Sequence, residues 1–286
     1  MLTLFHWLAR RPLWFLQGLG AVLGWLTWAA SPTYRRRFAE HAAQAGLAPA
    51  EARPAIAAAG RMVGELPYLW MRPKPQPGAP HIEWEGAEHV VSAMQQGRGV
   101  VYLTPHLGCF EITAQACAAR FAPEFGPLTV LFRPSRKAML REVMNASRAQ
   151  PGLATAPATL AGVRQMIRAL RRGEAVGLLP DQVPPEGMGV WVPFFGRPAY
   201  TMTLAARLIQ QTGAVPLLIW GERLPRGAGY RIRIGPLDEP LPASDPAQAE
   251  SAALVNRAME RLIRQCPGQY LWGYNRYKQP RAADRA

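Results

Sequence analysis

Residues 100–111 read VVYLTPHLGCFE, and this stretch decides the class of fold. Val100 to Leu103 are apolar without interruption, which predicts a short β-strand that is buried on both faces. Such strands belong to parallel sheets covered by helices, because a strand with one face in water alternates apolar and polar side chains. Thr104 and Pro105 end the strand, and a helix is expected from about Cys109.

The alternation of strand and helix continues through the rest of the chain. Apolar runs occupy residues 128–132, 175–179 and 215–220, and helical patterns are expected from about Lys137 and over Pro246 to Gln265. This order predicts an α/β fold with a mostly parallel central sheet flanked by helices. Residues 230–234 alternate instead, with Arg231 and Arg233 facing one way, so we expect them to form an edge strand.

His106 follows the first strand and therefore lies at the carboxyl end of a sheet strand, where sites of open α/β sheets are found. Gly108 permits a close approach of the chain, and Glu111 falls in the first turn of the expected helix. The two side chains can then pair, so that the carboxylate fixes the imidazole tautomer and the other nitrogen takes a proton from a hydroxyl. The alternative is a histidine that only caps the helix or bonds the loop.

The cysteines and histidines indicate neither disulfides nor a metal. The three cysteines, at positions 109, 117 and 266, lack the spacing of a Cys-x-x-Cys pair or a disulfide framework, so a reducing compartment is expected. The five histidines are scattered and form no cluster with the spacing of zinc ligands. Because Cys109 is close to His106, a covalent acyl-enzyme is an alternative route, although a buried cysteine usually acts as a small apolar side chain.

An uncharged apolar segment near the N-terminus predicts a membrane anchor. Leu13 to Ala30 are 18 residues without a charge, flanked by Arg10 and Arg11 on one side and by the arginines at 35–37 on the other. At about 1.5 Å per residue, a helix of this length is just short of the roughly 30 Å hydrocarbon core. A span, a helix in the plane of the interface, a buried core helix and a cleaved signal peptide are the alternatives. The arginines that follow favour a cytoplasmic main domain.

Proline-rich composition sets the expected domain boundaries. Residues 33–71 read as two helices, and Arg72 to Pro80 contains four prolines and is expected to be an extended connector. We therefore predict an anchor over residues 1–32, a helical pair and connector over 33–80, and the main domain over 81–286.

The chain is strongly basic. It has 33 Lys and Arg against 19 Asp and Glu, a formal net charge of +14, so its partners are expected to be anionic: nucleic acid, lipid headgroups or an acidic carrier protein. No nucleic-acid-binding motif is present, and the apolar N-terminus would be unexplained, so nucleic acid is not expected. Arg168, Arg171 and Arg172 read either as a solvated helix face or as part of a docking surface.

Five motifs occur in order along the chain. They are His106 to Glu111, Phe132-Arg133-Pro134, Pro180-Asp181-Gln182, Val192-Pro193-Phe194-Phe195-Gly196, and Tyr270-Leu271-Trp272 with Asn275-Arg276-Tyr277-Lys278. Together they resemble the late acyltransferases of lipid A biosynthesis, the lauroyl and myristoyl transferases, in the lysophospholipid acyltransferase superfamily. The resemblance covers nearly the whole chain and implies a glycerolipid acyltransferase-like fold with an N-terminal membrane-anchoring helix.

The resemblance implies transfer of an acyl chain from acyl carrier protein to a hydroxyl of a Kdo-bearing lipid A precursor. It places the protein at the cytoplasmic face of the bacterial inner membrane, with a glycolipid acceptor and no cofactor beyond the acyl thioester donor. His106 and Glu111 match the family's His-x-x-x-x-Asp/Glu motif and are the expected catalytic dyad. No covalent intermediate is required.

The remaining motifs imply substrate-binding residues. Arg133 is expected to bind a phosphate, since a planar guanidinium can engage phosphate oxygens in two places. Asp181 and Gln182 match the family's Asp-Gln pair and end another strand, so they are expected at the same sheet edge as His106. In the tail motif, Arg276 and Lys278 are expected to contact substrate.

Some features depart from the family pattern and leave alternatives open. Relatives commonly carry a histidine at the position of Tyr274 and a run of threonines where residues 199–203 read AYTMT. The acceptor could therefore be a lysophospholipid or an amino-acid-containing lipid, with acyl-CoA as an alternative donor. Trp191, Phe194 and Phe195 are expected either to pack in the core or to line an acyl-chain channel.

Overall fold

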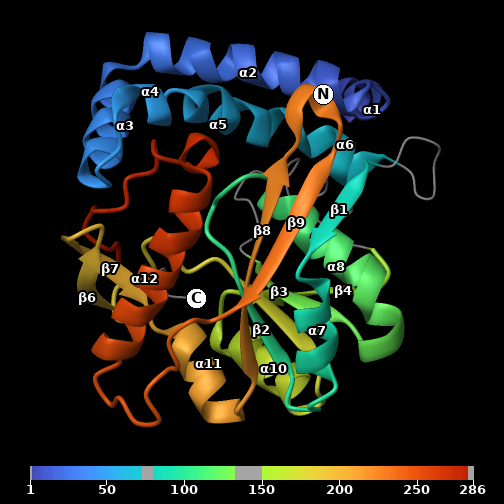
Figure 1. Cartoon of the computed structure of the whole chain (residues 1–286), viewed down its shortest axis with the longest axis vertical. Helices are drawn as coiled ribbons and strands as arrows, with labels where there is room; N and C mark the ends of the chain where they lie inside the picture. The colour runs from blue at the N-terminus through green and yellow to red at the C-terminus, as the bar shows by residue number, and fades with distance from the viewer. Residues whose placement is uncertain (1, 73–79, 133–149, 283–286) are drawn as a thin grey trace.

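A computed structural model gives the structure of residues 2–72, 80–132 and 150–282. Its centre is a seven-stranded sheet with the strand order β1-β9-β8-β2-β5-β3-β4 (Figure 1). The strands are β1 (Ile82–Glu85), β2 (Val100–Leu103), β3 (Leu128–Phe132), β4 (Leu153–Pro157), β5 (Ala175–Leu178), β8 (Val215–Arg223) and β9 (Tyr230–Pro236). A separate antiparallel hairpin consists of β6 (Gly189–Phe194) and β7 (Arg197–Met202).

Most neighbouring strands run in the same direction. The pairs β8–β2, β2–β5, β5–β3 and β3–β4 are parallel, while β9 is antiparallel to β8 and parallel to β1. The predicted, mostly parallel sheet is therefore confirmed. The physical reason is visible in β2, all of whose residues are buried, with Val100 and Tyr102 packed in one core and Val101 and Leu103 in the other.

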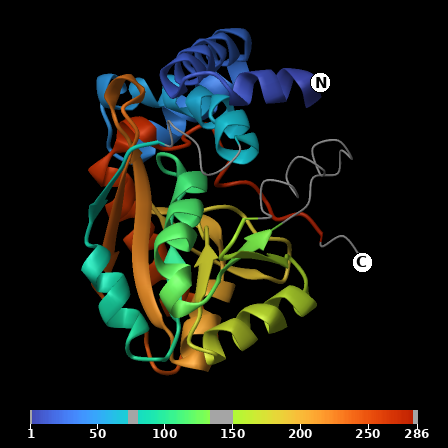
Figure 2. The ribbon, with the colours of Figure 1, turned by 90° about the vertical axis from the view of Figure 1, so that its right-hand side faces the viewer.

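Helices cover both faces of the sheet (Figures 1 and 2). On one face lie α7 (Ala87–Met94) and α8 (Phe110–Phe125). On the other lie α10 (Leu160–Arg171), α11 (Leu204–Thr212) and α12 (Ala249–Gln265). The helix expected from Lys137 lies outside the described residues.

Residues 2–71 form a helical layer across the carboxyl end of the parallel strands (Figure 1). The helices are α1 (Leu2–Ala9), α2 (Leu13–Ala30), α3 (Pro32–Gln44), α4 (Pro49–Ala52), α5 (Pro54–Gly64) and α6 (Leu66–Met71). The prediction of two helices over residues 33–71 is wrong. Prolines at or next to the first residue divide this segment into four, because a proline ring is compatible only with the first turn of a helix. Residues 73–79 of the expected connector lie outside the described ranges.

Helix α2 packs along α5 through glycines that bring the two backbones into contact. A Cβ at Gly20 would lie 2.6 Å from the carbonyl oxygen of Gly60, and one at Gly64 would lie 2.6 Å from that of Leu16. Among the described residues, α2 alone is long and apolar enough to cross a membrane by length and composition, and 28% of it is buried within the molecule. Its outer face leaves Trp14, Val22 and Leu26 more than half exposed.

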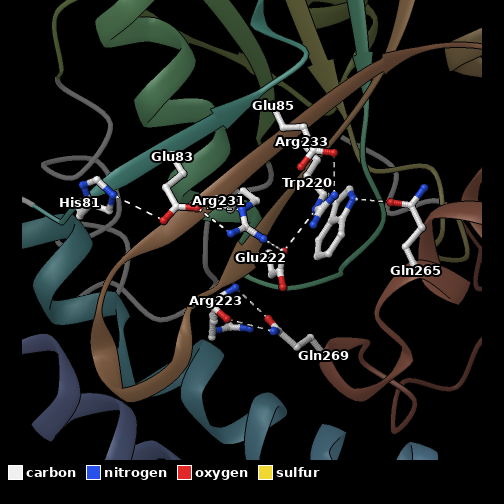
Figure 3. A network of polar contacts seen from close by, with 10 residues as sticks. All are labelled: His81, Glu83, Glu85, Trp220, Glu222, Arg223, Arg231, Arg233, Gln265 and Gln269. Carbon is white, nitrogen blue, oxygen red and sulfur yellow. Dashed lines mark hydrogen bonds and ion pairs between the residues drawn. The ribbon is translucent and has the colours of Figure 1, made fainter.

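The expectation that residues 230–234 form an edge strand is wrong, because β1 pairs along the outer side of β9. The arginine side chains of β9 are partly exposed and are paired with carboxylates. Arg231 pairs with Glu83 at 2.8 Å, and Arg233 pairs with Glu85 at 2.7 Å and with Glu222 at 3.2 Å (Figure 3). Cross-strand ion pairs therefore produce the alternation that an exposed edge would also produce.

A leucine in place of Gly24 is expected to separate α2 from α5. Its Cβ would clash with the carbonyl oxygen of Ile56, and overpacking of this kind costs about 1–3 kcal/mol. Gly18→Leu is the matched control, since a Cβ there meets nothing within 4 Å. Thermal unfolding of the detergent-solubilised protein should show a Tm lower by roughly 2–4 °C per kcal/mol in Gly24→Leu only. An unchanged Tm would contradict the close backbone contact.

Candidate active site

The loop after β2 is held in place by backbone hydrogen bonds to three other segments. The amide of Thr104 donates to Leu178, that of Gly108 to Gln269 at 3.0 Å, and that of Cys109 to Gly221 at 2.8 Å. Gly108 has a φ of +58°, and a Cβ at this position would collide with the carbonyl oxygen of Gly221. The expected close approach at Gly108 is thus present, and it fixes the loop that carries His106.

Asp181 binds His106 through both carboxylate oxygens. Its Oδ1 lies 2.7 Å from the Nδ1 atom of His106, and its Oδ2 accepts a hydrogen bond from the backbone amide of His106 at 2.8 Å. His106 follows β2 and Asp181 follows β5, which is hydrogen-bonded to β2. The prediction that both residues lie at the same sheet edge is therefore confirmed by their contact.

The surroundings of Asp181 keep it ionised. Burial by itself would raise the pKa of this carboxyl group, whose exposed fraction is 1%. The charge and hydrogen bonds of His106, with a contribution from Arg276, outweigh burial and lower the pKa below its usual value. Burial, followed by the charge of Asp181, raises the pKa of the Tyr270 hydroxyl well above its usual value.

An ionised Asp181 determines the tautomer of His106. Because a carboxylate only accepts hydrogen bonds, Nδ1 of His106 carries the proton and Nε2 presents its lone pair. The side-chain amide of Gln182 donates to that Nε2 at 3.0 Å. Gln182 therefore lies where a hydroxyl group would approach the imidazole.

Glu111 lies in the first turn of α8, as predicted. The hydrogen bond that the structure describes for its carboxylate is with Trp70 and not with His106. Its Oε2 accepts a hydrogen bond from the indole nitrogen of Trp70 at 3.1 Å. Among the described residues, the carboxylate hydrogen-bonded to the imidazole of His106 is Asp181, not Glu111. A catalytic role of Glu111 stays a prediction.

An apolar cavity of about 300 Å³ begins at His106, Glu111 and Gln182 and extends between α8 and the sheet. It continues past Tyr102 and Gly177, which are paired in register, toward Leu128 at the start of β3. Its further lining residues are Thr104, Phe110, Thr113, Ala114, Cys117, Val130, Leu131, Phe132, Leu178, Leu179 and Ile219. The imidazole thus lines a hollow whose mostly apolar walls suit a hydrocarbon chain.

Arg276 and Lys278, the tail residues predicted to bind substrate, lie in different surroundings. The guanidinium group of Arg276 is buried and donates to the carbonyl oxygen of Tyr200 and to the Thr201 hydroxyl, both at 2.7 Å. Lys278 lies over the ring of Tyr274, with 4.9 Å from Nζ to the centroid. The described hydrogen bonds of Arg276 are therefore to other protein groups, and its role in substrate binding stays a prediction. Arg133 lies outside the described residues.

The aromatic stretch after Asp181 is not part of the cavity. Phe194 and Phe195 are buried in the core below α12, and Trp191 on the β6–β7 hairpin is 45% exposed. Core packing is therefore the correct alternative for the two phenylalanines. Within the described ranges, no three His, Cys, Asp or Glu side chains are grouped as metal ligands would be.

Two residues of the site were not singled out from sequence. Trp70, on α6, belongs to a helical segment that gave no catalytic pattern. Tyr270 was part of a recognised motif, but the isolated bridge that joins it to Leu107, next to His106, links segments that are far apart in the chain. Only the motif at the tail could have signalled its importance.

A buried aspartate, a histidine whose Nε2 accepts a hydrogen bond and an adjoining apolar cavity define the protein as an α/β protein equipped for acid–base chemistry on an apolar substrate. Residues 52–279 match the family described as bacterial lipid A biosynthesis acyltransferase. The chain belongs to this family.

Individual relatives are consistent with that assignment. The chain is 27% identical over 195 residues to the lipid A biosynthesis palmitoleoyltransferase of Escherichia coli K12, and 28% identical over 194 residues to the lauroyltransferase of the same strain. Each match covers 68% of this chain and 60% of the relative. A lipid A biosynthesis acyltransferase of Haemophilus influenzae is 24% identical over 190 residues, which are 66% of this chain and 57% of that protein. The chain thus spans about 60% of the length of these relatives.

The thiols beside the cavity are expected to be unreactive in the folded protein. Burial raises the pKa of Cys117 to about 12 and that of Cys109 well above its usual value, so the nucleophilic thiolate is scarce at pH 8. Titration with a disulfide reagent such as DTNB should modify Cys109 and Cys117 only after unfolding. Rapid labelling of Cys109 in the native protein, assigned with Cys109→Ala, would restore a covalent route.

Proposed function

We propose that the protein transfers a fatty acyl chain from acyl carrier protein to a hydroxyl group of a lipid A precursor. The observation that carries this proposal is the contact between His106 and Asp181 at the mouth of an apolar cavity. The cavity provides room for an acyl chain, and the imidazole provides a base next to the carbonyl end of that chain. The relatives' names supply the class of acceptor.

The proposed reaction proceeds without a covalent enzyme intermediate. The acceptor hydroxyl displaces Gln182 from Nε2 of His106, gives its proton to that nitrogen, and its oxygen attacks the thioester carbonyl carbon. Asp181 stabilises the resulting imidazolium ion. When the tetrahedral intermediate collapses, the carbon–sulfur bond breaks and the imidazolium returns the proton to the departing thiolate. The products are an ester and a free carrier thiol.

Glu111 is assigned a positioning role in this proposal. Its carboxylate is held by the Trp70 indole and faces the cavity that His106 also lines. A carboxylate in that position can accept a hydrogen bond from the acceptor and hold its hydroxyl near Nε2. The alternative is the His106–Glu111 dyad predicted from the sequence, in which Glu111 forms a hydrogen bond with the imidazole once substrate is bound.

The charge of the chain supports an acidic donor and an anionic membrane. A net charge of +14 favours association with acyl carrier protein and with anionic lipid. We propose the cytoplasmic face of the bacterial inner membrane as the location. Helix α2 is best accommodated flat in the interface, because α5, which lies along it, carries Arg61 and would have to enter the hydrocarbon core with it.

The proposed activity is tested with membranes that contain the protein. Acyl carrier protein and CoA thioesters are each combined with lipid A precursors and with lysophospholipids, and products are identified by mass. We expect acylation of the lipid A precursor with the carrier protein donor. Transfer to the lysophospholipid alone would show that the proposed acceptor is wrong, and transfer from the CoA thioester alone would show that the proposed donor is wrong.

The same assay separates the two carboxylates. Asp181→Asn is expected to lower kcat by about 10³–10⁴-fold, as when an amide replaces the carboxylate that fixes a catalytic imidazole. His106→Ala should abolish turnover, and Glu111→Gln should have the smaller effect. If Asp181→Asn retains activity while Glu111→Gln loses it, Glu111 is the working partner of His106.

Gly177 is expected to influence which acyl chain is used. A Cβ there would lie 3.2 Å from Cγ1 of Val130 and 3.8 Å from Cδ1 of Leu128, so Gly177→Val narrows the cavity. Each methylene group that no longer fits loses about 0.8 kcal/mol of burial, which favours shorter donors. Competition between donors of different length measures the shift. Gly235→Val is the control, since a Cβ there meets nothing within 4 Å, and an equal preference in both variants would contradict the channel.

A further inference from the structure

A second cavity, of about 670 Å³, lies outside the acyl channel, between the start of α2, α5 and the turn that joins β8 to β9. It is lined by Trp14, Gln17, Gly18, Arg61, Arg223, Leu224, Pro225, Arg226, Gly227 and Gln269. The turn lies directly against α2, because a Cβ at Gly227 would be 2.6 Å from the backbone nitrogen of Trp14. The cavity is therefore bounded by the sheet on one side and by the apolar N-terminal helix on the other.

The charges around this cavity do not balance. Arg223 donates from Nε to both oxygens of Glu65, at 2.9 and 3.0 Å, while Gln17 donates to the same carboxylate at 2.7 Å. Nη1 and Nη2 of Arg223 have no hydrogen-bond partner, although the residue is only 6% exposed. Among the described residues, the structure records no ion pair for Arg61 or Arg226. Three guanidinium groups thus share one carboxylate.

Arg223 is buried, Arg61 is partly buried and Arg226 is exposed, so an excess of positive charge surrounds a partly enclosed cavity. Such an arrangement favours the binding of an anion. The effect is visible at Arg61, whose pKa is lowered first by burial and then by the charge of Arg223. Unpaired donors on a buried guanidinium group lose their hydration without compensation. A phosphate group would supply the missing negative charge and several acceptor oxygens, which guanidinium groups bind in pairs.

The position of the cavity identifies the source of that phosphate. Trp14 lines it and is also 61% exposed, on the same helix whose outer face leaves Val22 and Leu26 exposed. Tryptophan side chains of this kind lie at the level of lipid headgroups. The arginines of the cavity are therefore next to the surface that contacts the bilayer.

We propose that this cavity binds the phosphate headgroup of an anionic glycerophospholipid from the surrounding leaflet, as a site separate from the acyl-transfer site. The site lies beside the catalytic loop. Gln269 lines the cavity, its side-chain amide pairs with the backbone of Arg223, and its carbonyl oxygen accepts the amide of Gly108 (Figure 3). A bound headgroup would hold this edge of the sheet against the membrane.

The test is lipid retention by the full-length protein in native mass spectrometry from detergent micelles. The probes are phosphatidylglycerol, diacylglycerol, which lacks the phosphate, and inorganic phosphate. We expect one phosphatidylglycerol to be retained saturably. Replacing two of the three lining arginines, Arg61→Gln with Arg226→Asn, should weaken it by at least about tenfold, since charge-assisted hydrogen bonds contribute about 1.5–3 kcal/mol. Asparagine suits position 226 because Arg226 has a φ of +57°.

The matched control removes two exposed arginines from α10, at the opposite end of the molecule, as Arg168→Gln with Arg171→Gln (Figure 1). It should leave retention unchanged. Equal loss in both double variants, or equal retention of diacylglycerol, would overturn the site. Displacement of the lipid by millimolar inorganic phosphate would contradict a phospholipid as the source of the bound phosphate group. The readout needs no acyl transfer, so the proposed activity can fail while this site stands.

Discussion

The structure depends on one buried carboxylate, Glu65, which joins three parts of the chain. It accepts hydrogen bonds from Gln17 on α2 and from Arg223 at the end of β8. The backbone of Arg223 is in turn bonded to Gln269, whose carbonyl oxygen accepts the amide of Gly108 in the loop that carries His106. Glu65 has no exposed surface and forms an ion pair with Arg223. The loss of either member of this pair would leave an uncompensated buried ion, at a cost of about 3–5 kcal/mol. The N-terminal helices, the sheet and the catalytic loop are therefore positioned by the same few atoms.

The same arrangement occurs twice at the carboxyl edge of the sheet. Asp181, after β5, is buried and bound by His106, just as Glu65 is buried and bound by Arg223. Each carboxylate is paired with a cation or potential cation from a neighbouring strand end, which supplies the partner that a buried carboxylate requires. The two pairs differ in the nitrogen atoms that do not contact the carboxylate. His106 keeps one nitrogen available for chemistry, whereas both terminal nitrogens of Arg223 are left without a protein acceptor.

The sequence predicted the elements that depend on local pattern. The buried strand at 100–103, the start of α8 and the shared sheet edge of His106 and Asp181 follow from apolar runs and strand ends. Contacts between distant segments were not predictable in this way. Glu111 is close to His106 in sequence, yet the imidazole is bonded by Asp181, because two strand ends bring these residues together while the first turn of α8 directs Glu111 toward Trp70. The placement of β9 failed for a similar reason, since β1 precedes it by more than a hundred residues along the chain.

The helical layer over the carboxyl edge has a consequence for how the protein can be produced. Trp70 and Glu65, which hold Glu111 and Arg223, belong to the segment before residue 72, and Gln17 belongs to α2 itself. The apolar N-terminus is thus not a detachable leader that could be trimmed to improve solubility. A chain begun at residue 81 would expose the cores beneath α5 and α6 and would remove the carboxylate that pairs with Arg223. A preparation that retains these helices keeps the contacts through which they hold Glu111 and Arg223.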